Sequence, residues 1–175
     1  MLFAIYNIQQ KQGTKTGETI EKDQGRTIVY GKDDQVVFQE VIVQDSFIER
    51  KTWYSTGKPK TEIHFTKGFL KDMLNGEKVE WYENGLKKSH YYFLNDKPDG
   101  TIREWHLSGN LKKIGFYSHG NMCGRYQEWH QNGLPAIQGM FQFGKKYGVW
   151  TYWDIQGKRL RTEHYGRADL RTDKH

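Results

Sequence analysis

The histidines are the first residues to consider for chemistry, since seven occur in the chain. His106 and His130 occupy the same place in two segments that lie 24 residues apart. Two strands per segment would put equivalent residues about 10 Å apart, whereas zinc needs bonds of about 2.0–2.1 Å to every ligand atom. No His-x-x-x-His pair occurs. We therefore expect half-buried structural histidines, with no metal and no cofactor.

Three carboxylates could form catalytic pairs, because Glu80, Glu104 and Glu128 each directly precede a tryptophan. They recur at the same 24-residue interval, so they too should lie about 10 Å apart. A position that recurs in every repeat serves the repeat, whereas catalysis needs one unique constellation. We expect cross-strand salt links to lysine or arginine, which contribute little where they are exposed.

The remaining nucleophile motifs are absent from the sequence. Cys123 is the single cysteine, which excludes an internal disulfide and a cysteine-based zinc site. His119 lies four residues from it, but at a predicted turn. Neither a Gly-x-Ser-x-Gly motif nor a glycine-rich phosphate loop before a helix occurs. The sequence predicts a protein that is not an enzyme and has no catalytic residues.

The elements that must position these side chains are set by a 24-residue period. Four series of residues keep the same register along the chain, and a shared period of this length indicates a repeat architecture. The series are Gly76, Gly100, Gly124 and Gly148; Trp81, Trp105, Trp129 and Trp153; Gly85, Gly109, Gly133 and Gly157; and Phe93, Tyr117, Phe141 and Tyr165.

Each repeat has the pattern of a β-hairpin. Alternating residues lead to Asn84-Gly85, and Asn-Gly between strands predicts a two-residue type I′ turn with positive φ at both positions. Gly68, Gly120 and Gly144 mark the opposite turn, with Asp96 in the equivalent place. The fold class predicted is all-β: an elongated, twisted antiparallel sheet, a meander of 24-residue β-hairpin repeats.

The aromatic series predict how the sheet is stabilised. Equivalent tryptophans about 10 Å apart cannot stack, so the Phe and Tyr series of the return strands should fill the gaps. This predicts an alternating ladder of tryptophan and Phe/Tyr rings along one face. Trp105 and Trp129 lie in mid-array, and truncating a well-buried ring there should cost about 3–5 kcal/mol.

One repeat domain is predicted to span residues 1–175. Residues 1–50 match the period poorly and are expected to form divergent β repeats that cap the sheet. Residues 51–166 hold the hairpin repeats, with four extra residues within 69–74 as a longer loop, and 167–175 form a charged tail. The start has no signal-peptide pattern and no apolar run reaches 18 residues, so we expect a cytoplasmic protein.

Charge is uneven along the chain, whose net charge is +6. Residues 143–175 hold 8 Lys or Arg against 4 Asp or Glu, including the cluster at Lys158, Arg159, Arg161, Arg167 and Arg171. Such a gradient suits an acidic partner or surface, and equally a solvated strand face. Nucleic acid is disfavoured as a partner, because the aromatic residues recur at structural positions instead of forming a stacking platform.

The repeats resemble the MORN-variant repeat, especially its bacterial form with a Gly-x-x-x-x-Trp/Tyr-Tyr-x-x-Gly core. Gly76–Gly85, Gly100–Gly109 and Gly124–Gly133 carry the likeness, although His106 and His130 replace the second aromatic residue. A short single-domain chain of such repeats is similar to YwqK-type antitoxin or immunity proteins. The resemblance implies stoichiometric neutralisation of a cognate bacterial toxin encoded by an adjacent gene. The alternative that it implies is a MORN-type scaffold or a module that binds acidic phospholipid membranes.

Partner-binding residues are predicted where a repeat position carries a side chain that the other repeats lack, because the fold does not demand it there. Tyr, Trp and Arg are also the commonest residues at interface hot spots. Six residues meet the first criterion: Arg103, His106, Arg125, Tyr126, His130 and Trp150.

Overall fold

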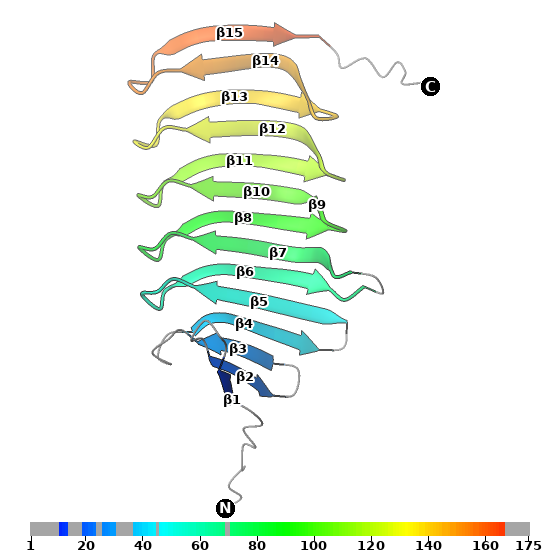
Figure 1. Cartoon of the computed structure of the whole chain (residues 1–175). Helices are drawn as coiled ribbons and strands as arrows, with labels where there is room; N and C mark the ends of the chain where they lie inside the picture. The colour runs from blue at the N-terminus through cyan, green and yellow to red at the C-terminus, as the bar shows by residue number, and fades with distance from the viewer. Residues whose placement is uncertain are drawn as a thin grey trace, which may run out of the picture.

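The protein is described by a computed structural model that covers residues 11–13, 19–23, 26–30, 37–44, 46–68 and 71–166. These residues form one 15-stranded antiparallel sheet (Figure 1). Its strands are β1 (Lys11–Gly13), β2 (Thr19–Asp23), β3 (Arg26–Tyr30), β4 (Val37–Gln44), β5 (Phe47–Trp53), β6 (Pro59–Thr66), β7 (Met73–Trp81), β8 (Lys87–Leu94), β9 (Lys97–Pro98), β10 (Gly100–Trp105), β11 (Leu111–Ser118), β12 (Asn121–Trp129), β13 (Pro135–Gln142), β14 (Lys145–Trp153) and β15 (Arg159–Tyr165).

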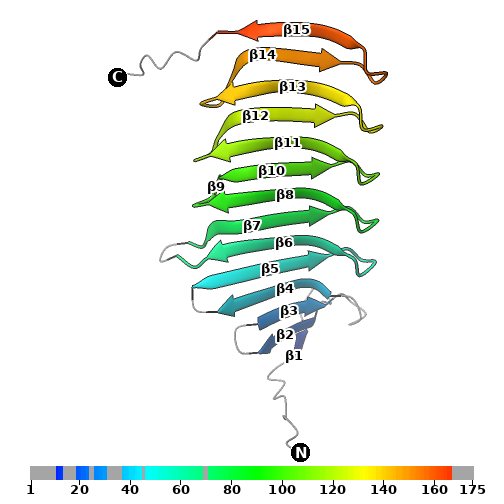
Figure 2. The same ribbon diagram turned by 180° about the vertical axis from the view of Figure 1, so that it is seen from behind.

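The strand order in space follows the strand order in the chain. Apart from the short β9, each strand from β1 to β15 pairs with the strands before and after it in the chain. Strand β9 lies beside this path and pairs with β8. Both views of the ribbon show the resulting elongated, twisted meander (Figure 2). The predicted fold class is confirmed. The described residues include no helix that is long and apolar enough to cross a membrane.

In the connections on the left in Figure 1, from β5–β6 to β14–β15, five residues separate the strands. The N–H of the first of them donates to the carbonyl of the fifth, which closes a three-residue loop. In the loop after β7, the Tyr82 N–H donates to the Leu86 carbonyl and the Gly85 N–H to the Tyr82 carbonyl, both at 2.8 Å. Gly85 has φ +90°, but Asn84 is not among the residues with positive φ. The prediction of a type I′ turn at Asn84-Gly85 is therefore wrong. A register shift next to Trp81 leaves a type I turn followed by a left-handed glycine.

The tight two-residue turns lie at the opposite edge. Asn95-Asp96, His119-Gly120 and Phe143-Gly144 have positive φ at both positions, as a type I′ turn requires. The predicted turns at Asp96, Gly120 and Gly144 are confirmed. The connection near Gly68 is longer, because β6 ends at Thr66 and β7 begins at Met73; residues 69 and 70 lie outside the described residues.

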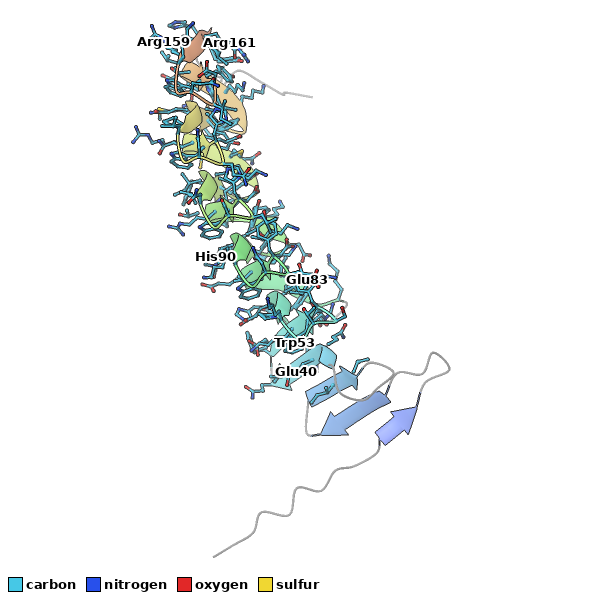
Figure 3. All side chains as sticks on the ribbon, turned by 90° about the vertical axis from the view of Figure 1, so that its left-hand side faces the viewer. Glu40, Trp53, Glu83, His90, Arg159 and Arg161 are labelled. Atoms are coloured by element: carbon cyan, nitrogen blue, oxygen red, sulfur yellow. The ribbon has the colours of Figure 1, made fainter. Side chains whose placement is uncertain are left out.

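The sheet is a single layer, with side chains on both of its sides (Figure 3). Residues paired across antiparallel strands share a face, so the register assigns each side chain. The packed face is the one that contains Ser89, Ile102, Trp150 and Tyr152, all buried. The exposed face is the one that contains Tyr92, Phe116 and Met140.

Trp150, on β14, belongs to the packed face and is only 1% exposed. Its ring lies 4.9 Å from that of Phe141 and 5.6 Å from that of Tyr126, between centroids. The indole occupies the space over Gly139, where an added Cβ would lie 2.2 Å from Cδ2. Gly115 makes room for Tyr126 in the same way, at 3.2 Å. A glycine in one hairpin therefore accommodates a large ring from the next strand.

The predicted alternating ladder of tryptophan and Phe/Tyr rings is wrong. Trp81 pairs with Lys87 beside the three-residue loop, whereas Phe93 pairs with Gly76 near the opposite end of the same two strands. The tryptophan series and the Phe/Tyr series therefore lie at opposite ends of the strands. Trp105 and Trp129 are half-buried, so the predicted cost of about 3–5 kcal/mol for a well-buried ring does not apply to them in full.

The described parts of residues 11–50 form β1 to β4 and the start of β5, all continuous with the repeats. Their interpretation as divergent repeats that cap the sheet stays a prediction. Residues 1–10 and the predicted charged tail at 167–175 lie outside the described residues.

Candidate functional site

The exposed face carries a row of large apolar side chains that we call the apolar stripe: Tyr92, Phe116, Met140 and Val149. The first three recur every 24 residues and are 46%, 43% and 48% exposed. They come from β8, β11 and β13, so the stripe runs across the strands. Large apolar side chains that gather on an exposed face can mark an interaction site.

Two arginines flank the apolar stripe. Arg125 is paired directly with Met140, and Arg103 with His90 and Ile114 on the same face. Both arginines are exposed, and neither forms an ion pair with any residue that the structure describes. The acidic Glu77 also pairs with this face, where its carboxylate lies 3.5 Å from the His90 imidazole. The part of the stripe from β10 to β13 is therefore positively charged.

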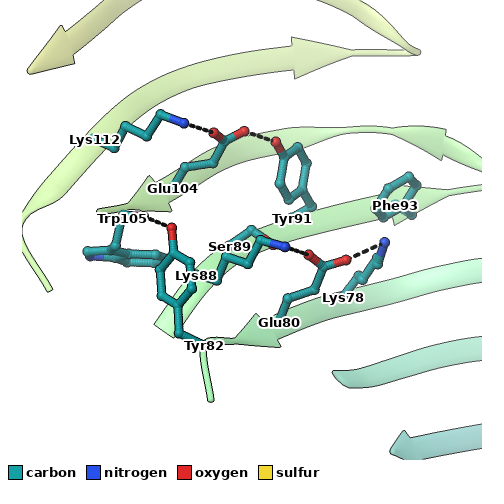
Figure 4. Close-up of a pocket in the computed structure, with 10 residues that line it drawn as sticks. All are labelled: Lys78, Glu80, Tyr82, Lys88, Ser89, Tyr91, Phe93, Glu104, Trp105 and Lys112. Carbon is teal, nitrogen blue, oxygen red and sulfur yellow. Dashed lines mark hydrogen bonds and ion pairs between the residues drawn. The ribbon is translucent and has the colours of Figure 1, made fainter. Parts of the chain in front are cut away.

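The packed face has a hollow of about 310 Å³ around two carboxylates (Figure 4). Glu80 lies 2.8 Å from the Lys78 ammonium and 3.7 Å from that of Lys88. Burial alone would raise the pKa of Glu80, but these lysines lower it below its usual range overall. A carboxylate held ionised in this way cannot serve as a general acid near neutral pH.

Glu104, the second carboxylate of this hollow, is held similarly. The Lys113 ammonium lies 2.6 Å away across the strands, and the Tyr91 hydroxyl donates a hydrogen bond to the carboxylate. Burial raises the pKa of Glu104, but Lys113 and Tyr91 outweigh it and lower the pKa. Burial and the neighbouring carboxylate raise the pKa of Tyr91. The predicted cross-strand salt link is confirmed here, whereas Glu128 accepts a hydrogen bond from Tyr126 instead.

His106 and His130 belong to a ladder of hydrogen bonds between successive repeats. Tyr54 and Tyr82 donate their hydroxyls to the carbonyls of Trp81 and Trp105, each at 2.8 Å. The next two members are the Nε2–H groups of His106, at 2.8 Å from the Trp129 carbonyl, and His130, at 3.0 Å from the Trp153 carbonyl. Histidine replaces tyrosine because both side chains offer a donor at similar reach. The predicted structural role is confirmed, and partner binding by these histidines stays a prediction.

The other predicted partner-binding residues divide between the two faces. Arg103 and Arg125 lie exposed beside the apolar stripe. Tyr126 is half-buried on the packed face, where its ring contacts Phe141 and Trp150. Trp150 belongs to the core, so its inclusion is corrected: at 1% exposure the indole cannot contact a partner directly.

Sequence reasoning missed the members of the apolar stripe. A signal was present, since Tyr92, Phe116 and Met140 each precede a member of the predicted aromatic series. Successive residues of a strand point to opposite faces, so two adjacent apolar residues in each repeat already implied apolar side chains on both faces.

One group of side chains could hold a cation. Nε2 of His64 lies 3.3 Å from Oε1 of Glu49 and 3.5 Å from Oε1 of Glu62, on the adjacent strands β5 and β6. The Lys51 ammonium lies 3.2 Å from the same oxygen of Glu49. Burial raises the pKa of Glu49, but Lys51 and the other neighbours lower it overall. Lys51 thus already supplies a positive charge to this cluster.

The architecture defines an open, single-layered protein of β-hairpin repeats. Two segments, residues 48–67 and 98–119, match the family model of the MORN repeat variant. Each segment contains one hairpin closed by a three-residue loop, β5–β6 and β10–β11. These two segments are similar to MORN-variant repeats, which are generally modules that bind proteins or membranes and are not typically enzymes. No curated protein matches the chain.

Proposed function

We propose that this protein binds a protein partner through the exposed face of its sheet. The finer proposal is an immunity protein, or antitoxin, that neutralises a cognate bacterial toxin in the cytoplasm by stoichiometric binding. The observation that carries the proposal is the apolar stripe flanked by Arg103 and Arg125. The apolar side chains keep about half of their surface exposed, and both arginines are exposed.

Burial of the apolar stripe gives a driving force of useful size. Fully burying an exposed Phe, Met or Val side chain is worth about 1.5–3 kcal/mol. Phe116, Met140 and Val149 are already about half-buried, so together they offer about 2–4 kcal/mol. Association costs of roughly 4 kcal/mol or more must first be offset. Additional contacts are therefore needed, and Tyr92 and the two arginines are of the types that dominate hot spots.

The charges of the exposed face favour a partner with an acidic surface. Arg103 and Arg125 have no ion-pair partner among the residues that the structure describes, and the whole chain carries a net charge of +6. A complementary surface would place carboxylates around an apolar ridge. Such complementarity raises the association rate, and this gain becomes smaller as the salt concentration rises.

Neutralisation by occlusion needs no chemistry from this chain. The carboxylates of the packed-face hollow are held by lysines, and the repeats supply an extended sheet surface instead. Inhibition of this kind follows mass action, so toxin activity should fall in proportion to added protein and stop near a fixed molar ratio.

The test is a titration against the product of the adjacent gene, followed by calorimetry and by that product's activity. Phe116→Ser and Arg125→Glu should weaken binding about tenfold or more if these are hot spots. Leu107→Ser is the matched control, because Leu107 is equally apolar and exposed but lies in a loop at the edge of the sheet. Each variant should keep the wild-type far-UV spectrum.

Co-sedimentation with acidic liposomes runs beside this titration. If the wild-type protein pellets with liposomes of acidic phospholipid and does not bind the adjacent gene product, the membrane-binding alternative replaces the proposal. Turnover at substoichiometric amounts would instead indicate an enzymatic antidote.

A further inference from the structure

The turn between β13 and β14 places an aromatic residue in a conformation that disfavours it. Phe143 is the first residue of this type I′ turn and has φ +50°. The left-handed region is routine for glycine and tolerated by asparagine, but it makes a bulky residue a genuine outlier. Phe143 is also 60% exposed, the highest value among the exposed large apolar residues of the described chain.

The equivalent turns of the two preceding hairpins are built differently. Asn95 and His119 occupy the place of Phe143, and both types are enriched at positive φ. Their backbone N–H groups donate to the side chains of Asn75, at 2.6 Å, and Asp99, at 3.1 Å. Cys123 stands where these acceptors would be in the third hairpin. No such side-chain hydrogen bond caps the Phe143 N–H in the structure as described.

The phenyl ring gains little contact from inside the described part of the molecule. It makes no ring contact with any described aromatic residue, and most of its surface is exposed. This turn therefore departs from its equivalents twice, and both departures remove stability. Strained residues that the fold does not need are found preferentially at functional sites.

The surroundings of Phe143 can receive a partner. A hollow of about 480 Å³ lies beside it, lined also by His119, Cys123 and Phe141. Cys123, which lines this hollow, is paired with Phe116 of the apolar stripe. Lys145, two residues further along, is exposed and has no acidic partner among the described residues.

We infer that Phe143 is an anchor residue for the protein partner. The inference rests on the proposed function and adds a second contact to it, at the edge of the sheet. The partner presents an apolar recess that receives the phenyl ring, with a carboxylate beside it for Lys145. Because the ring is already exposed and the turn is fixed by its pairing of Gln142 with Lys145, little needs to be rearranged on binding.

The test measures folding and binding in the same variant. Phe143→Asn introduces the residue found at Asn95, and its thermal midpoint should rise because the turn is relieved of strain. Its affinity for the product of the adjacent gene should fall about tenfold or more. Leu107→Asn, at the opposite edge, is the matched control and should bind as the wild type does. Lys145→Glu should weaken binding in a salt-dependent way without a change in midpoint.

Three outcomes would count against the anchor. A lower midpoint for Phe143→Asn would mean that the ring stabilises the fold, which removes the premise. If the wild type binds the adjacent gene product and Phe143→Asn binds it with the same affinity, the anchor is rejected and the proposed function stands. Wild-type protein that does not bind the adjacent gene product would reject the proposed function, and the anchor with it.

Discussion

The fit of Trp150 over Gly139 predicts strong coupling between these two positions. Gly139 has no Cβ, and the indole of Trp150 fills the space where one would be: an added Cβ would lie 2.2 Å from Cδ2 and 2.3 Å from Cε2. The indole cannot simply swing away. It is packed against Phe141 and Tyr126, and its Nε1–H donates to the Met140 carbonyl at 3.1 Å.

The magnitudes follow from this geometry. Gly139→Ala alone overpacks the site and should cost about 1–3 kcal/mol of the free energy of unfolding. Trp150→Ala alone removes a fully buried ring and should cost about 3–5 kcal/mol. In the double variant the new methyl group meets no ring, and Ala is better than Gly in a strand by about 0.5–1 kcal/mol. The double variant should therefore be no less stable than Trp150→Ala, with a coupling of about 2 kcal/mol or more.

The assay is urea denaturation followed by far-UV circular dichroism, because removing a tryptophan alters the fluorescence signal. Trp105→Ala is the control partner for Gly139→Ala, since Trp105 lies on β10 and is half-buried. That pair should be additive within about 0.5 kcal/mol. A Gly139→Ala variant with the wild-type free energy of unfolding would refute the coupling between Gly139 and Trp150. A cost of Gly139→Ala that is the same with and without Trp150 would refute it as well.

Three further predictions concern other contacts. His106→Tyr should unfold at nearly the same urea concentration as the wild type, whereas His106→Phe should lose about 0.5–1.5 kcal/mol, because phenylalanine cannot donate to the Trp129 carbonyl. Cys123→Asn should raise the thermal midpoint, because the amide oxygen can accept the Phe143 N–H as Asn75 accepts that of Asn95; a lower midpoint would contradict the comparison of the three turns. The Arg161 guanidinium, with the Tyr165 and Tyr152 hydroxyls, lowers the pKa of Glu163 from 4.5 to about 2. A pKa lowered by folding means that this stabilisation is present above pH 4.5 and is lost as the pH falls towards 2. The thermal midpoint of Glu163→Gln should accordingly fall less steeply than that of the wild type over this window.

The sequence was sufficient to predict the hairpins but not the type of their turns. Glycines at a 24-residue interval place most connections of the hairpin repeats between residues 76 and 165. Asn84-Gly85 has the composition of a type I′ turn, yet the register shift between Glu80 and Trp81 adds a residue to the loop. Such a shift depends on the pairing of two strands, which a single strand's residues do not specify.

The candidate site was predicted only in part, because its members are defined by the face of the sheet. Arg103 and Arg125 were found since they break the repeat, and the structure places both on the exposed face. Trp150 breaks the repeat too, but its size is accommodated by the loss of a side chain at Gly139. A residue that differs between repeats can thus be required by the fold when the residue packed against it in the adjacent hairpin makes room for it.

The order of the strands has a consequence for how such a protein can change in length. Apart from the short β9, every strand pairs only with the strands before and after it in the chain, so removing one 24-residue unit would leave two ends that can join in the same arrangement. Each unit adds two strands, or about 10 Å, to the sheet. Duplication or loss of a unit would lengthen or shorten the exposed face in steps of that size while the remaining hairpins keep their contacts. The length of the exposed face can therefore change in evolution while the fold stays the same.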